Sequence, residues 1–152
     1  MGETIAALSS GLVPSGVAVI RVSGPRARFA LETISGKVPP PRLASLRRLR
    51  HPVGGAELDH ALVLYFPCPD SVTGEDVAEF HCHGGVAVVE GVLDALLAIE
   101  GVAAAEPGAF TRQAFANGKL DLTQIEALGD LIDAGTQAQR DQALAQLSGS
   151  AR

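Results

Sequence analysis

The stretch TGEDVAEFHCHGG, Thr73–Gly85, constrains the fold more than any other part of this sequence. It combines a turn around Gly74, the apolar segment VAEFH at 77–81, and the glycine pair Gly84 and Gly85 ahead of a helical pattern. Three carboxylates, two histidines and one cysteine also lie within it. Because a strand that leads through a tight turn into a helix is typical of a sheet covered by helices, the stretch indicates an α+β domain.

The residues before this stretch predict three strands and a helix. The runs TIAAL at 4–8 and VAVIRV at 17–22 are apolar, partly β-branched and bounded by Gly, Pro and Ser, as strands are. ALVLYF at 61–66 is a third run of this kind. Between them, SGPRARFALETISG predicts a short helix with Ser23 as its cap and Gly36 at its end. The residues expected on the buried face of this helix are Phe29, Ala30 and Ile34.

The residues after the glycine pair change to a helical period. The apolar positions that recur at this period are Val88, Val89, Val92, Leu96 and Ile99. A weaker strand is expected at 101–106, followed by Pro107 and a short helix within AFTRQAFANG. Further along, Thr123 and Glu126 form a capping box ahead of an apolar stripe. This last pattern predicts the beginning of a separate helical module.

Composition bounds the class of protein. The sequence has 152 residues, of which 47% are apolar and 19% charged, and this is enough to bury the core of one ordinary domain. A net charge of −5 argues against sequence-independent phosphate binding by the whole surface. With no membrane-length apolar run and no secretory signal, we expect a cytoplasmic protein that makes no membrane contact. Cys68 and Cys82 are expected to be reduced thiols.

One basic segment stands out against this acidic background. RLASLRRLR places four arginines within nine residues, and they are Arg42, Arg47, Arg48 and Arg50. The segment can be a solvated strand or loop face, or it can contact nucleic acid. No aromatic residues are interleaved for base stacking, and this favours the first interpretation.

The histidines and glycines of the central stretch raise the questions of a metal site and of a phosphate site. Strand alternation sends His81 and His83 to one side and Cys82 to the other, so this segment offers a metal at most two ligands. The P-loop spacing G-x-x-x-x-G-K-[ST] does not occur in the sequence. Gly84 and Gly85 could open an anion-binding helix N-terminus or form a simple strand-to-helix turn, and both interpretations stay open.

Two charged residues sit in otherwise apolar strands. Glu79 shares a strand face with Val77, and Arg21 closes the run VAVIR. A carboxylate in such a place needs partners, because burying it alone costs several kcal/mol. A flat heterocycle with adjacent ring N–H and amino donors would satisfy Glu79, and a ligand carbonyl or carboxylate would satisfy Arg21. The residues also allow Arg21 and Glu79 to pair with each other or with nearby charges, and the residues alone slightly favour this interpretation.

Three segments together resemble a known family. VAVIRVSGP at 17–25, TGEDVAEFHCHGG at 73–85, and EPGAFTRQAFANGKLDLTQIEALGDLIDA at 106–134 resemble the N-terminal part of the MnmE/TrmE family. Members of this family are tRNA-modifying GTPases that build the 5-carboxymethylaminomethyl group on the wobble uridine. The resemblance runs in order through nearly the whole chain, and the third segment is its most specific part.

The resemblance implies a fold and a domain organisation. Residues 1–118 would form a tetrahydrofolate-binding and dimerising domain, a mixed sheet with packed helices. Residues 119–152 would begin an all-α helical domain. The G domain, which uses GTP, Mg²⁺ and K⁺, and the C-terminal cysteine motif of such proteins are not within this sequence. We therefore expect this chain alone not to be catalytic.

The resemblance also implies a ligand and partners. In the family, 5-formyl-tetrahydrofolate or a related tetrahydrofolate binds where the N-terminal domains of a homodimer meet. Matching the motifs residue by residue places the contacts at Arg21, Glu79 and Lys119. A flavoprotein of the MnmG/GidA type and tRNA would be the further partners. The alternative is a free-standing dimerisation or scaffold module in which the three residues are only structural ions.

The sequence departs from the family pattern in two places. Ala109 stands where the family usually has the glutamate of PGEF, so a carboxylate at a helix start is missing. The loop SSGLVPSG at 9–16 replaces the usual TPPGRGG and lacks its arginine. Both changes bear on the dimer contacts and the N-terminal loop, and neither touches the three proposed ligand residues.

Overall fold

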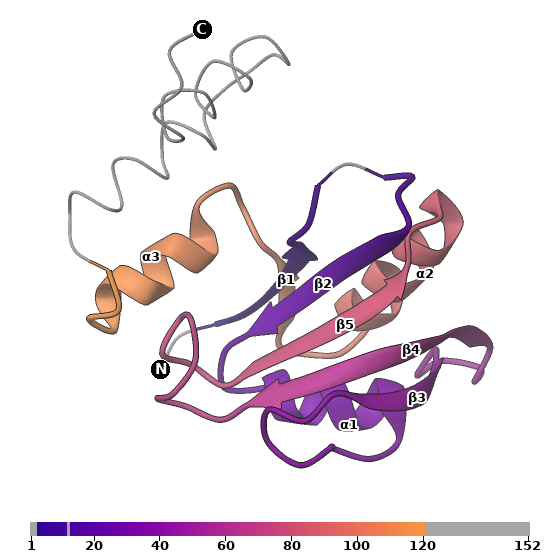
Figure 1. Cartoon of the computed structure of the whole chain (residues 1–152), viewed down its shortest axis with the longest axis horizontal. Coiled ribbons are helices and arrows are strands. Elements are labelled where there is room, and N and C mark those ends of the chain that lie inside the picture. Colours follow the sequence, from indigo (N-terminus) through magenta and orange to yellow (C-terminus); the bar gives the residue numbers. More distant parts are fainter. Residues whose placement is uncertain (1–2, 12, 121–152) are drawn as a thin grey trace, which may run out of the picture.

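The computed structural model of the chain describes residues 3–11 and 13–120, and these form one six-stranded sheet with three helices (Figure 1). The elements are β1 Thr4–Leu8, β2 Val17–Ser23, α1 Ala27–Ser35, β3 Ser45–Arg50, β4 Glu57–Phe66, β5 Val77–His83, α2 Val86–Leu97, β6 Val102–Ala104 and α3 Ala109–Ala116. The strand order is β3-β4-β5-β2-β1-β6, with β6 parallel to β1 and all other neighbours antiparallel. The expected α+β fold with a mixed sheet is confirmed.

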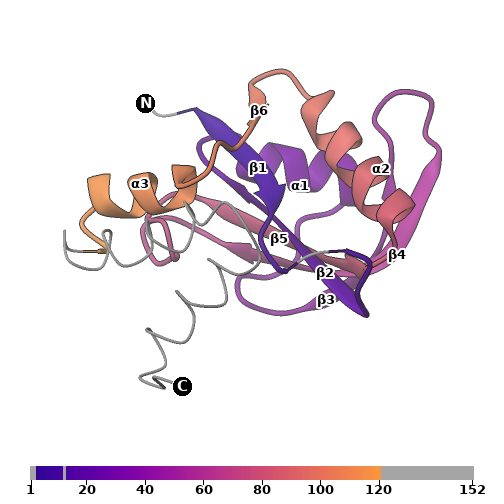
Figure 2. The ribbon, with the colours of Figure 1, turned by 90° about the horizontal axis from the view of Figure 1, so that it is seen from above.

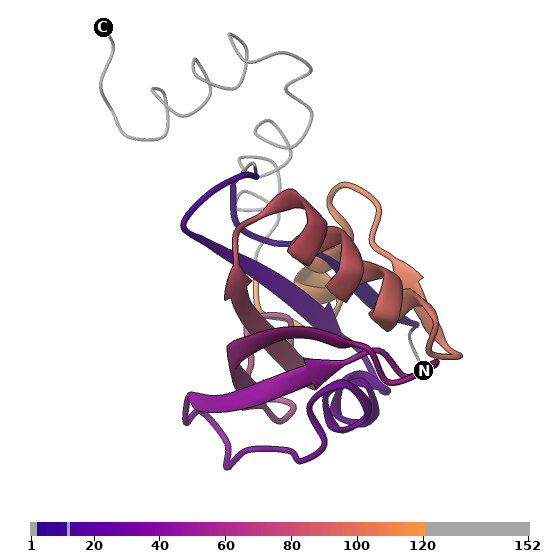
Figure 3. The same cartoon turned by 90° about the vertical axis from the view of Figure 1, so that its right-hand side faces the viewer.

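The core lies between the sheet and the two helices α1 and α2, which cover the same face of it (Figure 2 and Figure 3). Alternate residues of the central strands point into this layer, because successive side chains of a strand face opposite sides. The fully buried ones on β2 and β5 are Ala18, Ile20, Val22, Ala78, Phe80 and Cys82. Each large apolar side chain buried in this way contributes about 1.5–3 kcal/mol to the folding free energy.

The opposite face of the sheet, which we call the open face, is not covered by α1 or α2. Register places Arg21 opposite Glu79, and His81 between Val19 and Leu62, on this face. Its large apolar side chains are solvent-exposed to an unusual degree, and they include Val17, Leu46 and Leu62. Among the described helices only α3 reaches it, at the end where β2 finishes. The open face therefore presents both charged and apolar side chains to solvent.

The first helix differs from the sequence prediction in two respects. Ser23 is the last residue of β2 and is fully buried, whereas α1 begins at Ala27, so Ser23 does not cap it. Thr4 Oγ1 instead accepts a hydrogen bond from the backbone N–H of Arg26, ahead of the helix. Phe29 is 48% exposed, and the guanidinium of Arg26 lies 4.4 Å from the centre of its ring. The expectation that Phe29 faces the core is wrong, because Ala27 and Leu31 complete the buried stripe.

Several strand boundaries in the structure also differ from those predicted from the sequence. The predicted strand at 61–66 is the second half of β4, whose polar first half, ELDH, pairs with β3 at the sheet edge. β5 continues two residues beyond the predicted 77–81, and the strand expected at 101–106 shortens to β6. Residues 45–50 of the basic segment form β3, an edge strand with its alternate residues exposed, and Arg42 lies in the turn before it.

Gly84 and Gly85 make the turn from β5 into α2, and the structure favours glycine at the two positions for different physical reasons. Gly84 exchanges backbone hydrogen bonds with the loop before β2, through Ser15 N–H and Gly16 C=O. A Cβ on Gly84 would collide with the backbone of Ser15, so only glycine fits. Gly85 has open space around its Cα and is the N-cap of α2. The glycine pair thus forms the expected strand-to-helix turn, and anion binding at this helix N-terminus stays a prediction.

No helix of the described residues is long and apolar enough to cross a membrane. The capping box of Thr123 and Glu126, and nearly all of the expected helical domain at 119–152, lie outside the described residues.

Candidate functional site

The centre of the open face holds an ion pair between Arg21 and Glu79. Arg21 donates from both Nε and Nη2 to Glu79 Oε2, at 3.1 and 2.9 Å. The side chains are 23% and 14% exposed, so the pair is partly shielded from water while remaining accessible from the open face. Charge-assisted hydrogen bonds of this kind are about twice as strong as neutral ones. The structure thus brings together two of the three residues that the sequence indicated.

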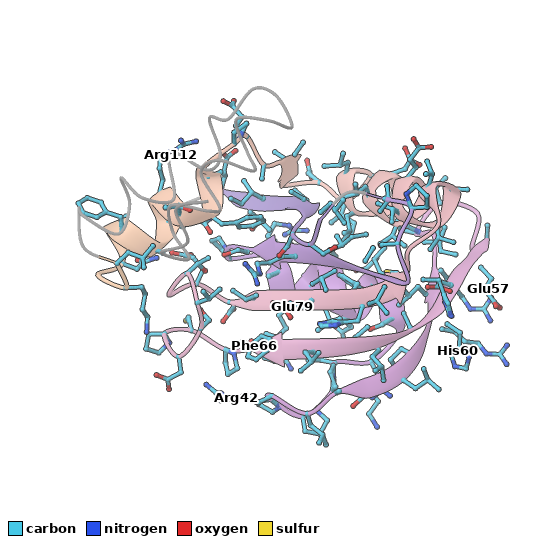
Figure 4. The ribbon with its side chains drawn as sticks, turned by 45° about the horizontal axis from the view of Figure 1, so that its top comes forward. Arg42, Glu57, His60, Phe66, Glu79 and Arg112 are labelled. Atoms are coloured by element: carbon cyan, nitrogen blue, oxygen red, sulfur yellow. The ribbon has the colours of Figure 1, made fainter. Side chains whose placement is uncertain are left out.

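His81 completes the surroundings of the Glu79 carboxylate. Its Nε2 lies 3.0 Å from Glu79 Oε1, so each carboxylate oxygen has a protein partner. The two residues are neighbours because they are two positions apart on β5 and therefore share a face. Figure 4 labels Glu79 on β5 and Phe66 on the neighbouring strand β4, where Leu64 is the residue opposite Glu79. Arg21, Glu79 and His81 form what we call the open-face cluster.

Helix α3 contributes an aromatic ring to this cluster. The guanidinium carbon of Arg21 lies 5.8 Å from the centre of the Phe110 ring, within the range of a cation–π contact. Phe110 is the second residue of α3, which is therefore joined to the charged centre of the sheet. Sequence reasoning missed both Phe110 and His81. The alternation of β5 could have identified His81 once Glu79 was chosen, whereas no local signal places Phe110 over Arg21.

Lys119, the third residue indicated by the sequence, is not in direct contact with the other two. It lies just past the end of α3, where its backbone N–H donates to Ala114 C=O at 2.7 Å, and the residue is exposed. Its side chain makes no hydrogen bond or ion pair with the rest of the described residues. Lys119 thus follows the helix that carries Phe110 and is exposed to solvent.

His83, two residues after His81 on β5, pairs with Asp59 on β4. Asp59 accepts hydrogen bonds from the backbone N–H of His83 at 2.9 Å and pairs with its Nδ1 at 2.8 Å. Burial pushes the pKa of Asp59 upward, but the hydrogen bonds from His83 and from the backbone of His60 outweigh it and hold the pKa below its ordinary value. No group of three or more metal-ligating side chains occurs in the part of the chain that the structure describes.

The two cysteines lie away from the cluster, and both are free thiols. Cys82 faces the core, where burial, together with the charge of Asp59, raises the pKa of its thiol to about 12. Cys68 is exposed in the turn after β4, and the neighbouring Asp76 carboxylate raises the pKa of this thiol as well. Both thiols stay protonated at neutral pH, so neither is a ready nucleophile.

A hollow of about 290 Å³ lies beside α3, on the side of β1. It is lined by Glu3, Ile5, Ala109, Arg112, Gln113 and Ala116. Ala109, the residue that departs from the PGEF pattern, is thus both the first residue of α3 and part of this wall. α3 has no acidic residue in its first turn and no side-chain cap, as the missing carboxylate predicts.

The fold is a small α+β domain in which a guanidinium, a carboxylate, an imidazole and an aromatic ring meet on an open sheet face. Residues 4–119 match the family described as GTP-binding protein TrmE N-terminus, and the chain belongs to this family. The suspected family relationship is confirmed.

Curated relatives agree with this assignment. The chain is 57% identical to the tRNA modification GTPase MnmE of Rhodopseudomonas palustris (strain BisB18) over 97% of its own length and 32% of that protein. It is 56% identical to the mitochondrial 5-taurinomethyluridine-[tRNA] synthase subunit GTPB3 of Danio rerio over 97% of its own length and 29% of that protein. The chain thus spans about a third of the length of the curated relatives it matches.

Proposed function

We propose that this chain is the tetrahydrofolate-binding and dimerising part of a tRNA wobble-uridine-modifying GTPase. Family membership and relatives named as tRNA modification GTPases support the assignment to tRNA modification. The observation that carries the ligand proposal is the open-face cluster, in which Arg21 and Glu79 lie together beside Phe110. The ligand is 5-formyl-tetrahydrofolate or a related tetrahydrofolate.

The chemistry of the cluster suits the pterin end of a folate. Pterin presents a ring N–H and an exocyclic amino group side by side, and a carboxylate accepts from both. Glu79 supplies this carboxylate, with 14% of its side chain open to solvent. Arg21 forms an ion pair with Glu79 and offers further N–H donors to a ligand carbonyl. The flat ring would lie over the apolar open face, beside Val19 and Leu64, which neighbour the pair on β2 and β4.

Lys119 suits the other end of such a ligand. A folate ends in carboxylates, and a solvent-exposed ammonium group on a flexible stem attracts them without a fixed geometry. Lys119 is exposed and follows the helix whose Phe110 contacts Arg21. The two cationic residues would therefore serve different parts of one ligand.

The proposed role of the chain is binding and positioning rather than bond-making. The folate would supply a one-carbon unit within a complex that contains a second copy of the chain, a flavoprotein of the MnmG/GidA type and tRNA. GTP hydrolysis, with Mg²⁺ and K⁺, belongs in this proposal to a G domain outside these 152 residues. We place the assembly in the cytoplasm.

Calorimetric titration of the 152-residue chain with 5-formyl-tetrahydrofolate tests the proposal. Glu79→Gln, which keeps the shape but removes the charge, is expected to weaken binding beyond detection, because loss of one partner of a shielded charged hydrogen bond costs about 2–5 kcal/mol. Glu57→Gln is the matched control, since Glu57 lies on neighbouring β4 with a half-exposed side chain. Absence of binding by the folded parent chain would refute the folate proposal.

One observation favours a second candidate function, a dimerisation or scaffold module without a ligand. Both oxygens of Glu79 already have protein partners in Arg21 and His81, so the cluster is complete without a ligand. Sedimentation analysis beside the titration separates the two candidates. A dimer that fails to bind folate supports the scaffold, whereas folate binding that depends on Glu79 supports the first proposal.

A further inference from the structure

We propose that Gln113 is a positioning residue that holds α3 against the sheet and so holds Phe110 over Arg21. Helix α3 packs against the sheet with little apolar surface. Ala114 is its one buried residue, and Phe115 is 48% exposed. One buried alanine and the half-buried ring of Phe110 bury little apolar surface for the docking of a helix, so polar contacts contribute to holding α3 in place.

Gln113 supplies these contacts through both ends of its side-chain amide. Its Oε1 accepts from the hydroxyl of Ser23 at 2.6 Å. Its Nε2 donates to the backbone carbonyls of Ser23 and Glu3, each at 3.4 Å. The amide therefore joins α3 to the end of β2 and to the residue before β1.

A buried hydroxyl pair sets the direction of these hydrogen bonds. Ser23 Oγ and Thr73 Oγ1 lie 2.7 Å apart, and the two residues are 0% and 1% exposed. Since Oε1 of Gln113 can only accept, Ser23 must give its one proton to it, and Thr73 must then donate to Ser23. The chain of hydrogen bonds from Thr73 through Ser23 needs an acceptor at its end. Gln113 is that acceptor, and a buried donor without one would cost stability.

Asn117 repeats the contact one turn further along. Its Nδ2 donates to Thr73 C=O at 2.9 Å and to Glu75 Oε2 at 2.7 Å. Residues three and four apart share one face of a helix, so Phe110, Gln113, Ala114 and Asn117 form a single stripe. This stripe is the docking face of α3, with amides at two positions where an apolar side chain is usual. The hydrogen bonds of Gln113 therefore fix where the ring of Phe110 lies, 5.8 Å from Arg21.

The consequence for ligand binding rests on the proposed function. If a folate lies over the open-face cluster, α3 supplies the ring beside Arg21, and the chain reaches Lys119 three residues past the end of α3. Gln113 touches neither Arg21 nor Glu79, yet its loss would displace both contributions together. Folate binding would then weaken by about tenfold, which is the effect expected when the buried hydrogen bonds of one side chain are lost.

The test uses a fluorescent reporter, because the sequence contains no tryptophan. Phe110→Trp in the 152-residue chain places a single indole over Arg21. Gln113→Glu in this background keeps the acceptor for Ser23 but turns the donor into an oxygen facing two carbonyls. We expect the tryptophan emission to shift to longer wavelength, as for a water-exposed indole, with unchanged far-UV circular dichroism. Phe115→Ala, an exposed position of the same helix, is the control and is expected to leave the emission unchanged.

Titration of the unmodified chain and of its Gln113→Glu variant with 5-formyl-tetrahydrofolate gives the second readout, with about tenfold weaker binding expected for the variant. If Gln113→Glu does not fold, Gln113→Met replaces it in both readouts. Unchanged emission in a folded Gln113 variant would overturn the positioning role, and shifted emission with unchanged affinity would overturn its link to the ligand. If the parent chain binds no folate, the proposed function fails, while the emission still shows whether Gln113 positions Phe110.

Discussion

Arg21 and Glu79, 58 residues apart in the chain, lie directly opposite each other on β2 and β5, with Nη2 and Oε2 2.9 Å apart. The two strands are the middle pair of the six-stranded sheet, so the ion pair is at the centre of the open face. A charged pair here has neighbours on every side and is reached by solvent from one direction only. This placement suits both a contribution to stability and the ligand-binding role proposed for the pair.

The ion pair is expected to stabilise the fold. Arg21→Met leaves the Glu79 carboxylate with His81 as its one side-chain partner and is expected to lower the free energy of unfolding by about 1–3 kcal/mol. Urea denaturation of Arg21→Met, Glu79→Gln and the double variant measures the coupling between the two residues. Additive effects would show that the pair contributes no interaction energy of its own.

The pKa of Asp59 should be measurably low, with a consequence for acid stability. Because the folded-state pKa lies below the unfolded value of about 3.9, Asp59 contributes stability above that value and loses it as the pH falls through its folded pKa. Carbon-13 NMR titration of the Asp59 carboxyl group measures the folded-state pKa directly.

His83→Ala is the companion variant for Asp59. It removes the imidazole and keeps the backbone donors, so the pKa of Asp59 is expected to rise part of the way toward its ordinary value. Asp59→Asn should destabilise the chain at neutral pH and have a smaller effect in acid. A destabilisation that grows as the pH falls would contradict the hydrogen-bonding explanation.

The two cysteines should react with thiol reagents at very different rates. Cys82 is 1% exposed with a pKa of about 12, so it is expected to resist alkylation at neutral pH until the protein unfolds. Cys68 is exposed and is expected to react first, though more slowly than a free cysteine, because Asp76 raises its pKa. Mass spectrometry after timed iodoacetamide treatment measures both rates. In Asp76→Asn the Cys68 rate should increase, and an unchanged rate would show that the carboxylate does not control this thiol.

Alanine substitutions of Gly84 and Gly85 should lower the stability of the fold by different amounts. Gly84→Ala forces a Cβ against the backbone of Ser15 and is expected to cost about 1–3 kcal/mol or more, because that backbone is itself hydrogen-bonded to Gly84. Gly85→Ala meets open space and loses only the preference for glycine at an N-cap, at most about 1 kcal/mol. Thermal denaturation of the two variants, followed by circular dichroism, provides the comparison. Equal losses would mean that the contact with Ser15 is not what requires glycine.

The local elements could be predicted because each rests on neighbouring residues. The alternation of VAVIRV and VAEFH gives strands with one face for the core, and the spacing of Val89, Val92 and Leu96 gives the helix after the glycine pair. The failures occurred where tertiary contacts override local preference. Ser23 resembles a helix cap but is used by Thr73 and Gln113, which are 50 and 90 residues away. The polar start of β4 carries no strand signal, since pairing with β3 is what makes it a strand.

The sequence alone was sufficient for the α+β class, the family and the choice of Arg21, Glu79 and Lys119 as candidates, because strand and helix periods and short motifs are local properties. The folded structure was needed to show that Arg21 and Glu79 meet, that His81 pairs with the Glu79 carboxylate, and that Phe110 lies over Arg21. These contacts depend on strand order, register and the docking of α3. Such arrangements are set by the packing of residues distant in the chain, and no local pattern encodes which distant residue will be the partner.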